Sequence, residues 1–340
     1  MIAKAGLLYL RMHPDGKAGL PHPRIPPDLL ARAVTRRSAL LRERVDEVTA
    51  EVLPALTRGG VRALLLKGPS TVDWLYGEER GRHYADTDIL VSSDELDAAG
   101  AILGELGFDC VFDERDYGAN PHAQLWSRDC SPDVDLHWQL PGIGAAPADA
   151  WRVLSTRTGT LSVEGAEVET LDAPARALHL AIHAAYHQRG PSRARQDLER
   201  ALRRLDDGVW AEAAALARCL RAEPAVGAGL RSVPSGEALA DRLELSRERE
   251  LDVALAGGRA RPGAHAISRV VNAPTGGGAL RLLARELFPP PSYMRVLASR
   301  PDAGRRQLAA AYARRLARGV CNAPGAIREV LRARHLNRRS

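Results

Sequence analysis

One stretch of sequence decides how the chain is interpreted, RHYADTDILV at residues 82–91. Its β-branched and apolar residues predict a strand, and in a strand side chains two residues apart project from the same face. Asp86 and Asp88 would therefore point the same way. Two carboxylates at a strand end either remain in solvent or share a cation, and Mg²⁺ suits such hard oxygen ligands because water and phosphate oxygens complete its shell.

The composition of the 340 residues predicts a soluble globular protein, with 45% hydrophobic and 26% charged residues. No apolar run approaches the length of a membrane span, so we expect a cytoplasmic protein with no membrane partner. The four cysteines are widely spaced, which argues against a disulfide framework or a zinc knuckle. The net charge of +6 is mostly arginine interleaved with acids, so nucleic acid is an unlikely partner.

The residues around this stretch predict alternating helices and strands as far as residue 172. Proline and glycine make residues 1–27 a flexible arm, and apolar spacing predicts helix over residues 28–56. Ser93 is a candidate cap for a helix over 94–106, and a hairpin turns at Glu164-Gly165. The other expected strands cover residues 61–66, 108–112, 123–126 and 134–138.

The chain changes character near residues 142–175. Beyond residue 173 it consists of long alanine-, leucine- and arginine-rich stretches with helical spacing. We therefore expect one domain over residues 28–172 and a helical domain over 173–340. The arginine-rich segment from Arg295 to Arg339 is amphipathic, and its charged face is either solvated or contacts a polyanion or acidic partner.

Several motifs together resemble the polymerase-β-type nucleotidyltransferases. They are Lys67-Gly68, Arg82 with Asp86-Thr87-Asp88, Val134-Asp135-Leu136-His137-Trp138, and a helix carrying His183 and His187. More narrowly, the chain is similar to a bacterial nucleotidyltransferase family often linked with biosynthetic gene clusters. The resemblance implies an α+β fold: a small mixed β-sheet nucleotidyltransferase domain with flanking helices, followed by a helical domain that binds the acceptor.

The resemblance also implies roles for individual residues. Asp86, Asp88 and Asp135 would be catalytic and would hold Mg²⁺, as two ions, beneath an NTP such as ATP. The implied phosphate-binding residues are Lys67, Gly68, Ser70 and Arg82, and the implied acceptor-side or supporting residues are His137, His183 and His187. The usual glycine pair or glycine–serine pair is replaced here by Gly68-Pro69-Ser70, and Pro69 has no N–H to donate.

Each of these residues has a structural alternative. Lys67 could lie in solvent, Arg82 could pair with Asp86, and His137 could be a hydrogen-bonded core histidine. His179, His183 and His187 follow at four-residue steps, which suits packing, acceptor contact or, less well, zinc.

The resulting hypothesis is an enzyme of specialised-metabolite biosynthesis that transfers NMP, from ATP, to a small-molecule or peptide acceptor. The alternative is a catalytically silent protein with the same fold that binds nucleotides or a partner. Turnover of NTP would favour the enzyme, whereas tight NTP binding without turnover would favour the silent protein.

Overall fold

The computed structural model describes most of the chain from Pro27 onward. The described residues are 27–77, 82–116, 121–187, 192–247, 253, 255, 263–271, 273, 275–291, 293–294 and 304–337. The side chains of residues 27–35 and 334–337 are not among them. The expected arm at residues 1–27 lies outside this part of the chain, apart from Pro27, where the first helix begins.

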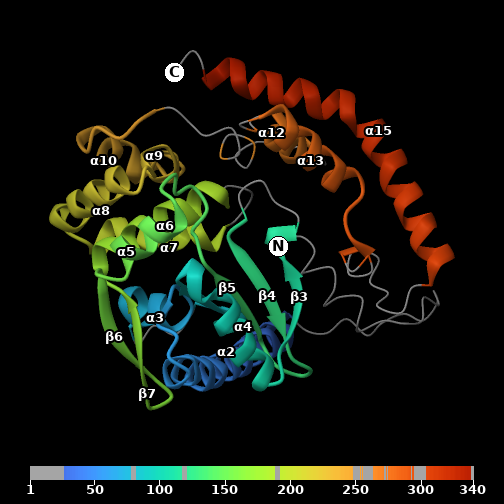
Figure 1. Ribbon diagram of the computed structural model, residues 1–340. Helices are drawn as coiled ribbons and strands as arrows, with labels where there is room; N and C mark the ends of the chain where they lie inside the picture. The colour runs from blue at the N-terminus through green and yellow to red at the C-terminus, as the bar shows by residue number, and fades with distance from the viewer. Residues whose placement is uncertain are drawn as a thin grey trace.

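A seven-stranded mixed sheet, in the order β3-β4-β5-β2-β1-β7-β6, forms the centre of the fold (Figure 1). The strands are β1 (Ala63–Leu65), β2 (Asp86–Val91), β3 (Asp109–Asp113), β4 (Ala123–Ser127), β5 (Asp133–His137), β6 (Thr158–Val163) and β7 (Ala166–Leu171). β2 runs parallel to β5 and antiparallel to β1. The α+β class is therefore confirmed, and the mixed sheet, with seven strands, is larger than the small sheet that was expected.

Two sets of helices cover the two faces of this sheet, because apolar side chains alternate along its strands. Ile89 and Val91 pack under α2 (Pro27–Arg58) and α4 (Leu96–Glu105). Leu64 and Leu90 instead pack against α6 (Ala173–Tyr186) on the opposite face. Residues of β2 with even numbers therefore face α6, and Asp86 and Asp88 belong to that set.

After β7 the described elements are helices, as expected. α6 is followed by α7 (Arg193–Arg204), α8 (Asp207–Cys219), α9 (Glu223–Leu230), α10 (Glu237–Arg242), α12 (Ala264–Val271), α13 (Gly276–Leu287) and α15 (Arg305–Asn337). The expected boundary at residue 172 coincides with Asp172, whose carboxylate accepts a hydrogen bond from the Ala175 amide and caps α6. The division into two domains stays a prediction, because one apolar cluster contains residues of the strands β1 and β2 together with residues of the helices α6, α7, α8 and α9.

Local predictions are confirmed at most elements and need two corrections. The hairpin between β6 and β7 turns at Glu164 and Gly165, which have φ of 48° and 79°. Ser92, and not Ser93, caps the turn that leads into α4: its hydroxyl accepts a hydrogen bond from the Asp94 amide at 3.4 Å. The helices α3 (Pro69–Tyr76) and α5 (Pro147–Leu154) both begin at proline, and α5 was not expected.

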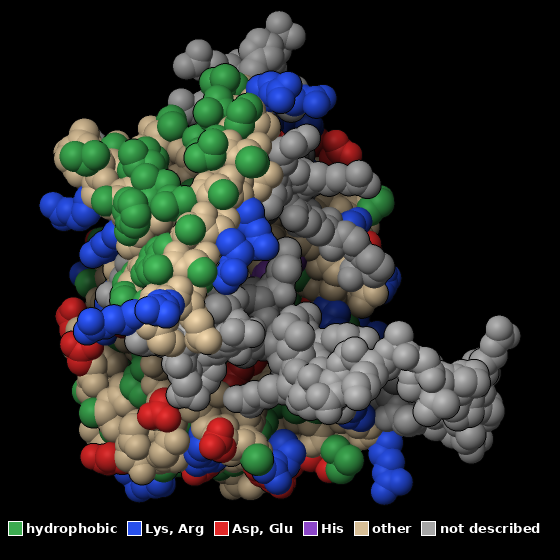
Figure 2. Space-filling model, turned by 90° about the vertical axis from the view of Figure 1, so that its right-hand side faces the viewer, with side chains coloured by type: hydrophobic (Ala, Val, Ile, Leu, Met, Phe, Trp, Pro, Cys, Tyr) green, Lys and Arg blue, Asp and Glu red, His purple; other side chains and the backbone are tan. Residues whose placement is uncertain are grey.

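The last helix, α15, runs along the outer edge of the molecule (Figure 1). Seen from that side, hydrophobic side chains gather in one region of the surface, with Lys and Arg side chains along its margin (Figure 2). Within the described part of the chain, no helix has both the length and the hydropathy needed to cross a bilayer.

Candidate active site

The site is built on β2 and β5, whose parallel register sets two aspartates side by side. Asp88 pairs with Asp135 across the two strands, and Asp86 lies two residues earlier on the same strand face as Asp88. Leu136 and Val134 pack into the apolar cluster on the other face, which leaves Asp135 and His137 on the face of Asp88. Alternation thus directs the acidic side chains toward α6.

Lys67 brings the three carboxylates into one electrostatic group. Its Nζ lies 2.9 Å from Asp88 Oδ1, directly beyond the end of β1. Burial would lower the pKa of Lys67, but Asp88, Asp86 and Asp135 together raise it above its ordinary value. The ammonium is therefore held in its charged form, and the alternative that Lys67 lies in solvent is wrong: its side chain is 17% exposed.

Asp88 is the most deeply buried of the acids, with 1% of its side chain exposed. Burial by itself would raise its pKa, but Lys67 and His137 outweigh burial and hold the pKa of Asp88 well below its usual range. His137 Nε2 lies 3.4 Å from Asp88 Oδ1, while Oδ2 is buried without a hydrogen-bond partner. A buried, ionised oxygen with no partner is a costly arrangement that a bound cation would relieve.

The donor set at this position fits a divalent metal ion. Asp88, Asp135 and His137 each offer one ligand atom, and these atoms lie within 4.8 Å of one another. Asp86 lies two residues before Asp88 on the same strand face and contributes to the charge around Lys67, but it is not one of these three residues. Carboxylate oxygens in this number suit Mg²⁺ or Mn²⁺, and the imidazole is also acceptable to transition metals.

The turn Lys67-Gly68-Pro69-Ser70 joins β1 to α3. Gly68 has φ of +74°, a conformation that other residues rarely adopt, and a Cβ at this position would lie 3.5 Å from the Tyr84 ring. Pro69 occupies the first turn of α3, where a missing N–H costs nothing. Ser70 is fully buried, and its hydroxyl lies 3.0 Å from that of Thr170. The Ser70 side chain is thus already engaged in the core.

Arg82 contacts Asp197 on α7, and not Asp86 as one alternative expected. Its Nε lies 2.9 Å from both Asp197 oxygens, and Nη2 lies 2.8 Å from Oδ2. Tyr76 donates a third hydrogen bond to Asp197 at 2.8 Å, and burial and the carboxylate raise the pKa of Tyr76 to about 12. Arg82 Nη1 is buried with no partner, so one end of the guanidinium still lacks an acceptor.

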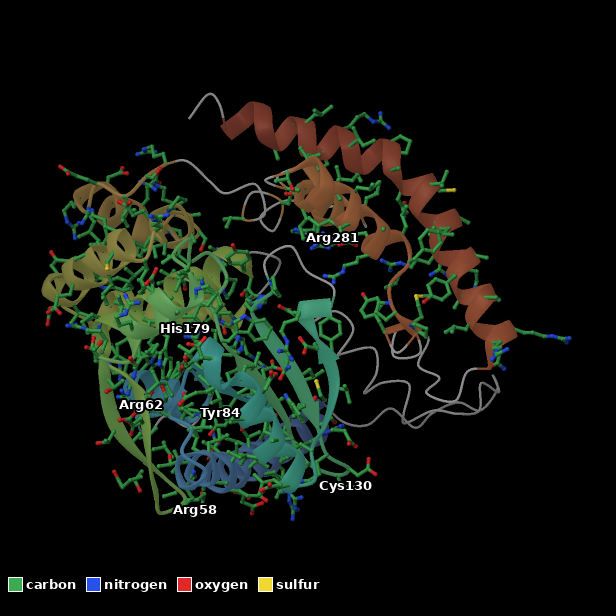
Figure 3. The ribbon with its side chains drawn as sticks, viewed as in Figure 1. Arg58, Arg62, Tyr84, Cys130, His179 and Arg281 are labelled. Atoms are coloured by element: carbon green, nitrogen blue, oxygen red, sulfur yellow. The ribbon has the colours of Figure 1, made fainter. Side chains whose placement is uncertain are left out.

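The histidines of α6 form a row on the side of the sheet that carries the acids. The His179 and His183 rings lie 6.2 Å apart and the His183 and His187 rings 4.4 Å apart. Burial, followed by the charge of Lys67, lowers the pKa of His179 to about 3 and of His187 to about 4, and lowers the pKa of His183 strongly. All three are therefore neutral near pH 7. Figure 3 shows His179 close to where the helices meet the sheet, with Tyr84 below it.

A second histidine pair, His122 just before β4 and His137 on β5, was not found from the sequence. His122 stacks on His137 with ring centroids 5.8 Å apart, and its Nδ1 lies 2.7 Å from Glu114. Burial would raise the pKa of Glu114, but the contact with His122 lowers it below its usual value. Glu114 thus orients the imidazole that packs against His137. Trp138, which follows His137, is part of the core and is 6% exposed.

Two solved structures resemble this chain at low sequence identity. A solved structure of the antibiotic-resistance factor ANT(2'')-Ia aligns with 17% identity over 51% of this chain and 91% of its own, with a TM-score of 0.36. An antigenic nucleotidyltransferase-like protein from Paracoccidioides brasiliensis aligns with 16% identity over 53% of this chain and 93% of its own, with a TM-score of 0.33. No curated protein matches the sequence.

A family model, described as an uncharacterised nucleotidyltransferase, matches residues 6–234 and so more than half of the chain. This range includes the carboxylate strands, the Lys67-Gly68 turn and the histidine helix. The chain belongs to this nucleotidyltransferase family.

Proposed function

We propose that the protein transfers NMP, in the form of AMP from ATP, to a small-molecule or peptide acceptor in a reaction that depends on Mg²⁺. The observation that carries the proposal is the group formed by Asp88, Asp135 and Lys67 on one face of the sheet. Besides its contact with Lys67, the buried Asp88 carboxylate has one oxygen without a hydrogen-bond partner beside a second carboxylate, which favours binding of a further cation. Membership of the nucleotidyltransferase family supports the same chemistry.

The triphosphate would lie against the turn after β1. Gly68 carries no side chain, so its backbone can approach phosphate oxygens, and Lys67 supplies a positive charge beside it. Arg82 would contribute Nη1, the guanidinium nitrogen that Asp197 leaves without a partner. Ser70 could contribute its backbone amide, since its side chain is engaged with Thr170. In this proposal the ammonium of Lys67 exchanges Asp88 for phosphate when the nucleotide binds.

The chemical step is an in-line displacement at the α-phosphorus. The acceptor oxygen forms a bond to that phosphorus, the bond to the bridging oxygen of the β-phosphate breaks, and pyrophosphate leaves. Bound Mg²⁺, as two ions held by Asp86, Asp88 and Asp135, would neutralise charge on the phosphate oxygens. Asp135 would take the proton from the acceptor hydroxyl, and Lys67 would stabilise the negative charge that remains.

The acceptor would bind between the sheet and the helices that follow it. His183 lies on α6 and His187 directly follows this helix, while His137 lies on β5 beside Asp88. Their neutral imidazoles can accept or donate hydrogen bonds to a hydroxyl or amide without adding charge. We place the chain in the branch of the family associated with bacterial biosynthetic clusters, where the acceptor would be an intermediate of a specialised metabolite.

Two measurements test this proposal. ATP labelled at the α-phosphate is incubated with Mg²⁺ and a panel of hydroxyl- and amine-bearing small molecules and peptides, and mass spectrometry detects the acceptor that gains AMP. Binding is measured separately, because a saturating ligand stabilises the fold by about 2.7 kcal/mol at 100 times its Kd. Mg²⁺ and ATP together should raise Tm in the wild type and not in Asp135→Asn.

A matched control removes a carboxylate of the same type outside the site. Asp94 is exposed beyond the far end of β2, so Asp94→Asn should keep both the Tm shift and the release of pyrophosphate. Equal behaviour of the two variants would refute the assignment of Asp135. Absence of metal-dependent pyrophosphate release with every acceptor would refute transfer.

The replaced glycine–serine turn supports a second candidate, a protein that binds NTP without turnover. Pro69 offers no N–H, and the Ser70 hydroxyl is occupied in the core, so two donors that would contact phosphate are absent. Calorimetry separates the candidates: tight binding of Mg²⁺ and ATP with no pyrophosphate release favours the second.

A further inference from the structure

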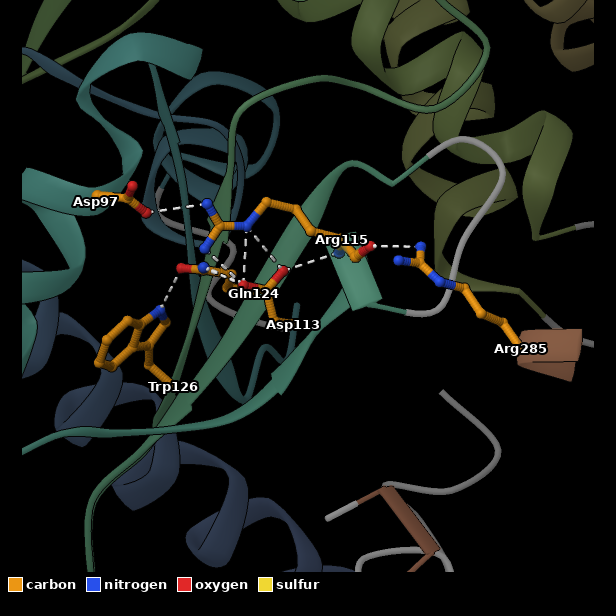
Figure 4. A network of polar contacts seen from close by, with 6 residues as sticks. All are labelled: Asp97, Asp113, Arg115, Gln124, Trp126 and Arg285. Carbon is orange, nitrogen blue, oxygen red and sulfur yellow. Dashed lines mark hydrogen bonds and ion pairs between the residues drawn. The ribbon is translucent and has the colours of Figure 1, made fainter. Parts of the chain in front are cut away.

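The C-terminal helices α12, α13 and α15 form a small unit beyond the residues that define the family. The family match ends at residue 234, and these helices begin at residue 264. They have a core of their own, in which Ala326 and Val330 of α15 pack with Ala264 of α12. At the edge of the sheet, Arg285 of α13 donates a hydrogen bond at 3.3 Å to the carbonyl of Arg115, which itself pairs with Asp97 and Asp113 (Figure 4).

The outer face of α15 carries an apolar stripe that is open to solvent. Val320, Ile327 and Leu331 are 74%, 46% and 59% exposed, although their spacing places them on one side of the helix. Ala309 and Ala313 extend the stripe toward the N-terminal end and are also exposed. From Ala309 to Leu331 the stripe is roughly 33 Å long at 1.5 Å per residue.

Arginines border this stripe on the exposed half of the helix. Arg314, Arg318, Arg328 and Arg332 are all exposed, and they follow one another along one flank of the stripe. Over its whole length the helix contains a single acidic residue, Glu329. The occupant of this face must therefore offer negative charge and apolar surface together.

We propose that α15 lies on the surface of a membrane rich in anionic lipid. The stripe would enter the boundary between headgroups and acyl chains, and the flanking arginines would bind lipid phosphates, which their planar donors match. Figure 1 shows α15 as a curved helix on the outside of the molecule, so its exposed side is open to an extended surface. Two other occupants fit this face less well. A nucleic acid would leave the apolar stripe exposed to water, and a second copy of the chain would bring one row of arginines against another row of the same charge.

This proposal departs from the expectation, drawn from the lack of a long apolar run, that no membrane is a partner. A helix that lies in the interface needs only one apolar face, so the two observations are compatible. The proposal is also independent of the chemistry at Asp88, because no residue of the site is involved.

The test uses the full-length protein and vesicles of stated composition. Co-sedimentation is measured with mixed phosphatidylglycerol–phosphatidylcholine vesicles and with vesicles of phosphatidylcholine alone. The wild type should prefer the anionic vesicles. Each arginine near such a surface changes partitioning by about fivefold, so Arg314→Gln, Arg328→Gln and Arg332→Gln combined should weaken binding by roughly 100-fold. Val320→Asp with Leu331→Asp should abolish it.

Two controls match these variants in charge and in hydrophobicity. Arg36→Gln, Arg58→Gln and Arg203→Gln remove the same charge from exposed positions on α2 and α7, and Leu40→Asp replaces an exposed leucine on α2. These controls should bind as the wild type does, and circular dichroism should show unchanged folding in all variants.

Other outcomes would overturn the proposal. Equal binding to both kinds of vesicle, or unchanged binding by the α15 variants, would exclude an anionic lipid surface. Dimers in sedimentation velocity that Val320→Asp disrupts would assign the stripe to a second copy. Nucleic-acid binding that depends on the arginines, together with lipid binding that does not require Val320 or Leu331, would assign the face to a polyanion.

Discussion

The buried pair between Arg82 and Asp197 predicts a large loss of stability when one partner is neutralised. The two side chains are 7% and 1% exposed, and three N–O distances between them are 2.8 or 2.9 Å. In Asp197→Asn the guanidinium stays buried without its counter-charge, which costs about 3–5 kcal/mol. The hydrogen bond from Tyr76 is also weakened, because its acceptor is no longer charged.

An exposed pair of the same chemistry provides the control. Arg152 Nη2 lies 2.8 Å from Asp149 Oδ1, but these side chains are 74% and 57% exposed. Solvent screens such a pair, so Asp149→Asn should cost less than about 1 kcal/mol. The free energy of unfolding is measured by urea titration, followed by circular dichroism and by tryptophan fluorescence to check that both report one transition.

A double variant distinguishes an uncompensated charge from lost packing. Replacing both partners with apolar residues, as Arg82→Met with Asp197→Leu, removes the unpaired charge and should recover most of the loss. Equal losses in Asp197→Asn and Asp149→Asn would refute the reasoning. A double variant no more stable than Asp197→Asn would show that the loss came from shape and not from charge.

Three further predictions follow from the site. Gly68→Ala should lower the free energy of unfolding in urea titration by about 1–2 kcal/mol, because φ is +74° there. Its control, Gly104→Ala, lies inside α4 with open space around it and should be neutral or stabilising. A loss of stability in both variants would contradict this reasoning. Lys67→Met leaves the Asp88 carboxylate without its ammonium partner. At equal ionic strength, Mg²⁺ should therefore raise the Tm of this variant more than it raises the Tm of the wild type. An equal rise in both proteins would count against cation exchange at Asp88. Between pH 6.5 and about 3 the unfolded chain binds a proton at His179 that the folded protein does not, so the free energy of unfolding falls as pH falls through this range. In urea titrations at several pH values, His179→Asn should reduce the slope of this free energy against pH by up to about 1.4 kcal/mol per pH unit. An unchanged slope would contradict the lowered pKa of His179.

Short-range patterns predicted the parts of the fold that depend on alternation and turn chemistry. The even-numbered positions of β2 begin with Asp86 and Asp88 while its odd positions are Thr87, Ile89 and Val91, so alternation places both acids on one face. The hairpin turn at Glu164-Gly165 has positive φ at both residues, and the glycine marks this turn in the sequence.

Contacts between distant residues left no comparable signal. Asp197 is 115 residues from Arg82, and no local pattern in the sequence connects the two side chains. The stacking of His122 on His137 depends on how β4 pairs with β5, which no local pattern determines. Apolar spacing on α15 was visible in the sequence, but a stripe that faces a core and one that faces solvent have the same period.

The proposed activity requires that the carboxylates of β2 and β5 hold a metal ion beneath a nucleotide. The direct test is a crystal structure with Mn²⁺ and a non-hydrolysable ATP analogue, in which anomalous scattering locates the metal. We predict Mn²⁺ about 2.1 Å from oxygens of Asp88 and Asp135, with the analogue's phosphates between the ion and the Gly68 turn. Metal peaks elsewhere, with Lys67 still paired to Asp88 and the nucleotide bound at another surface, would contradict it.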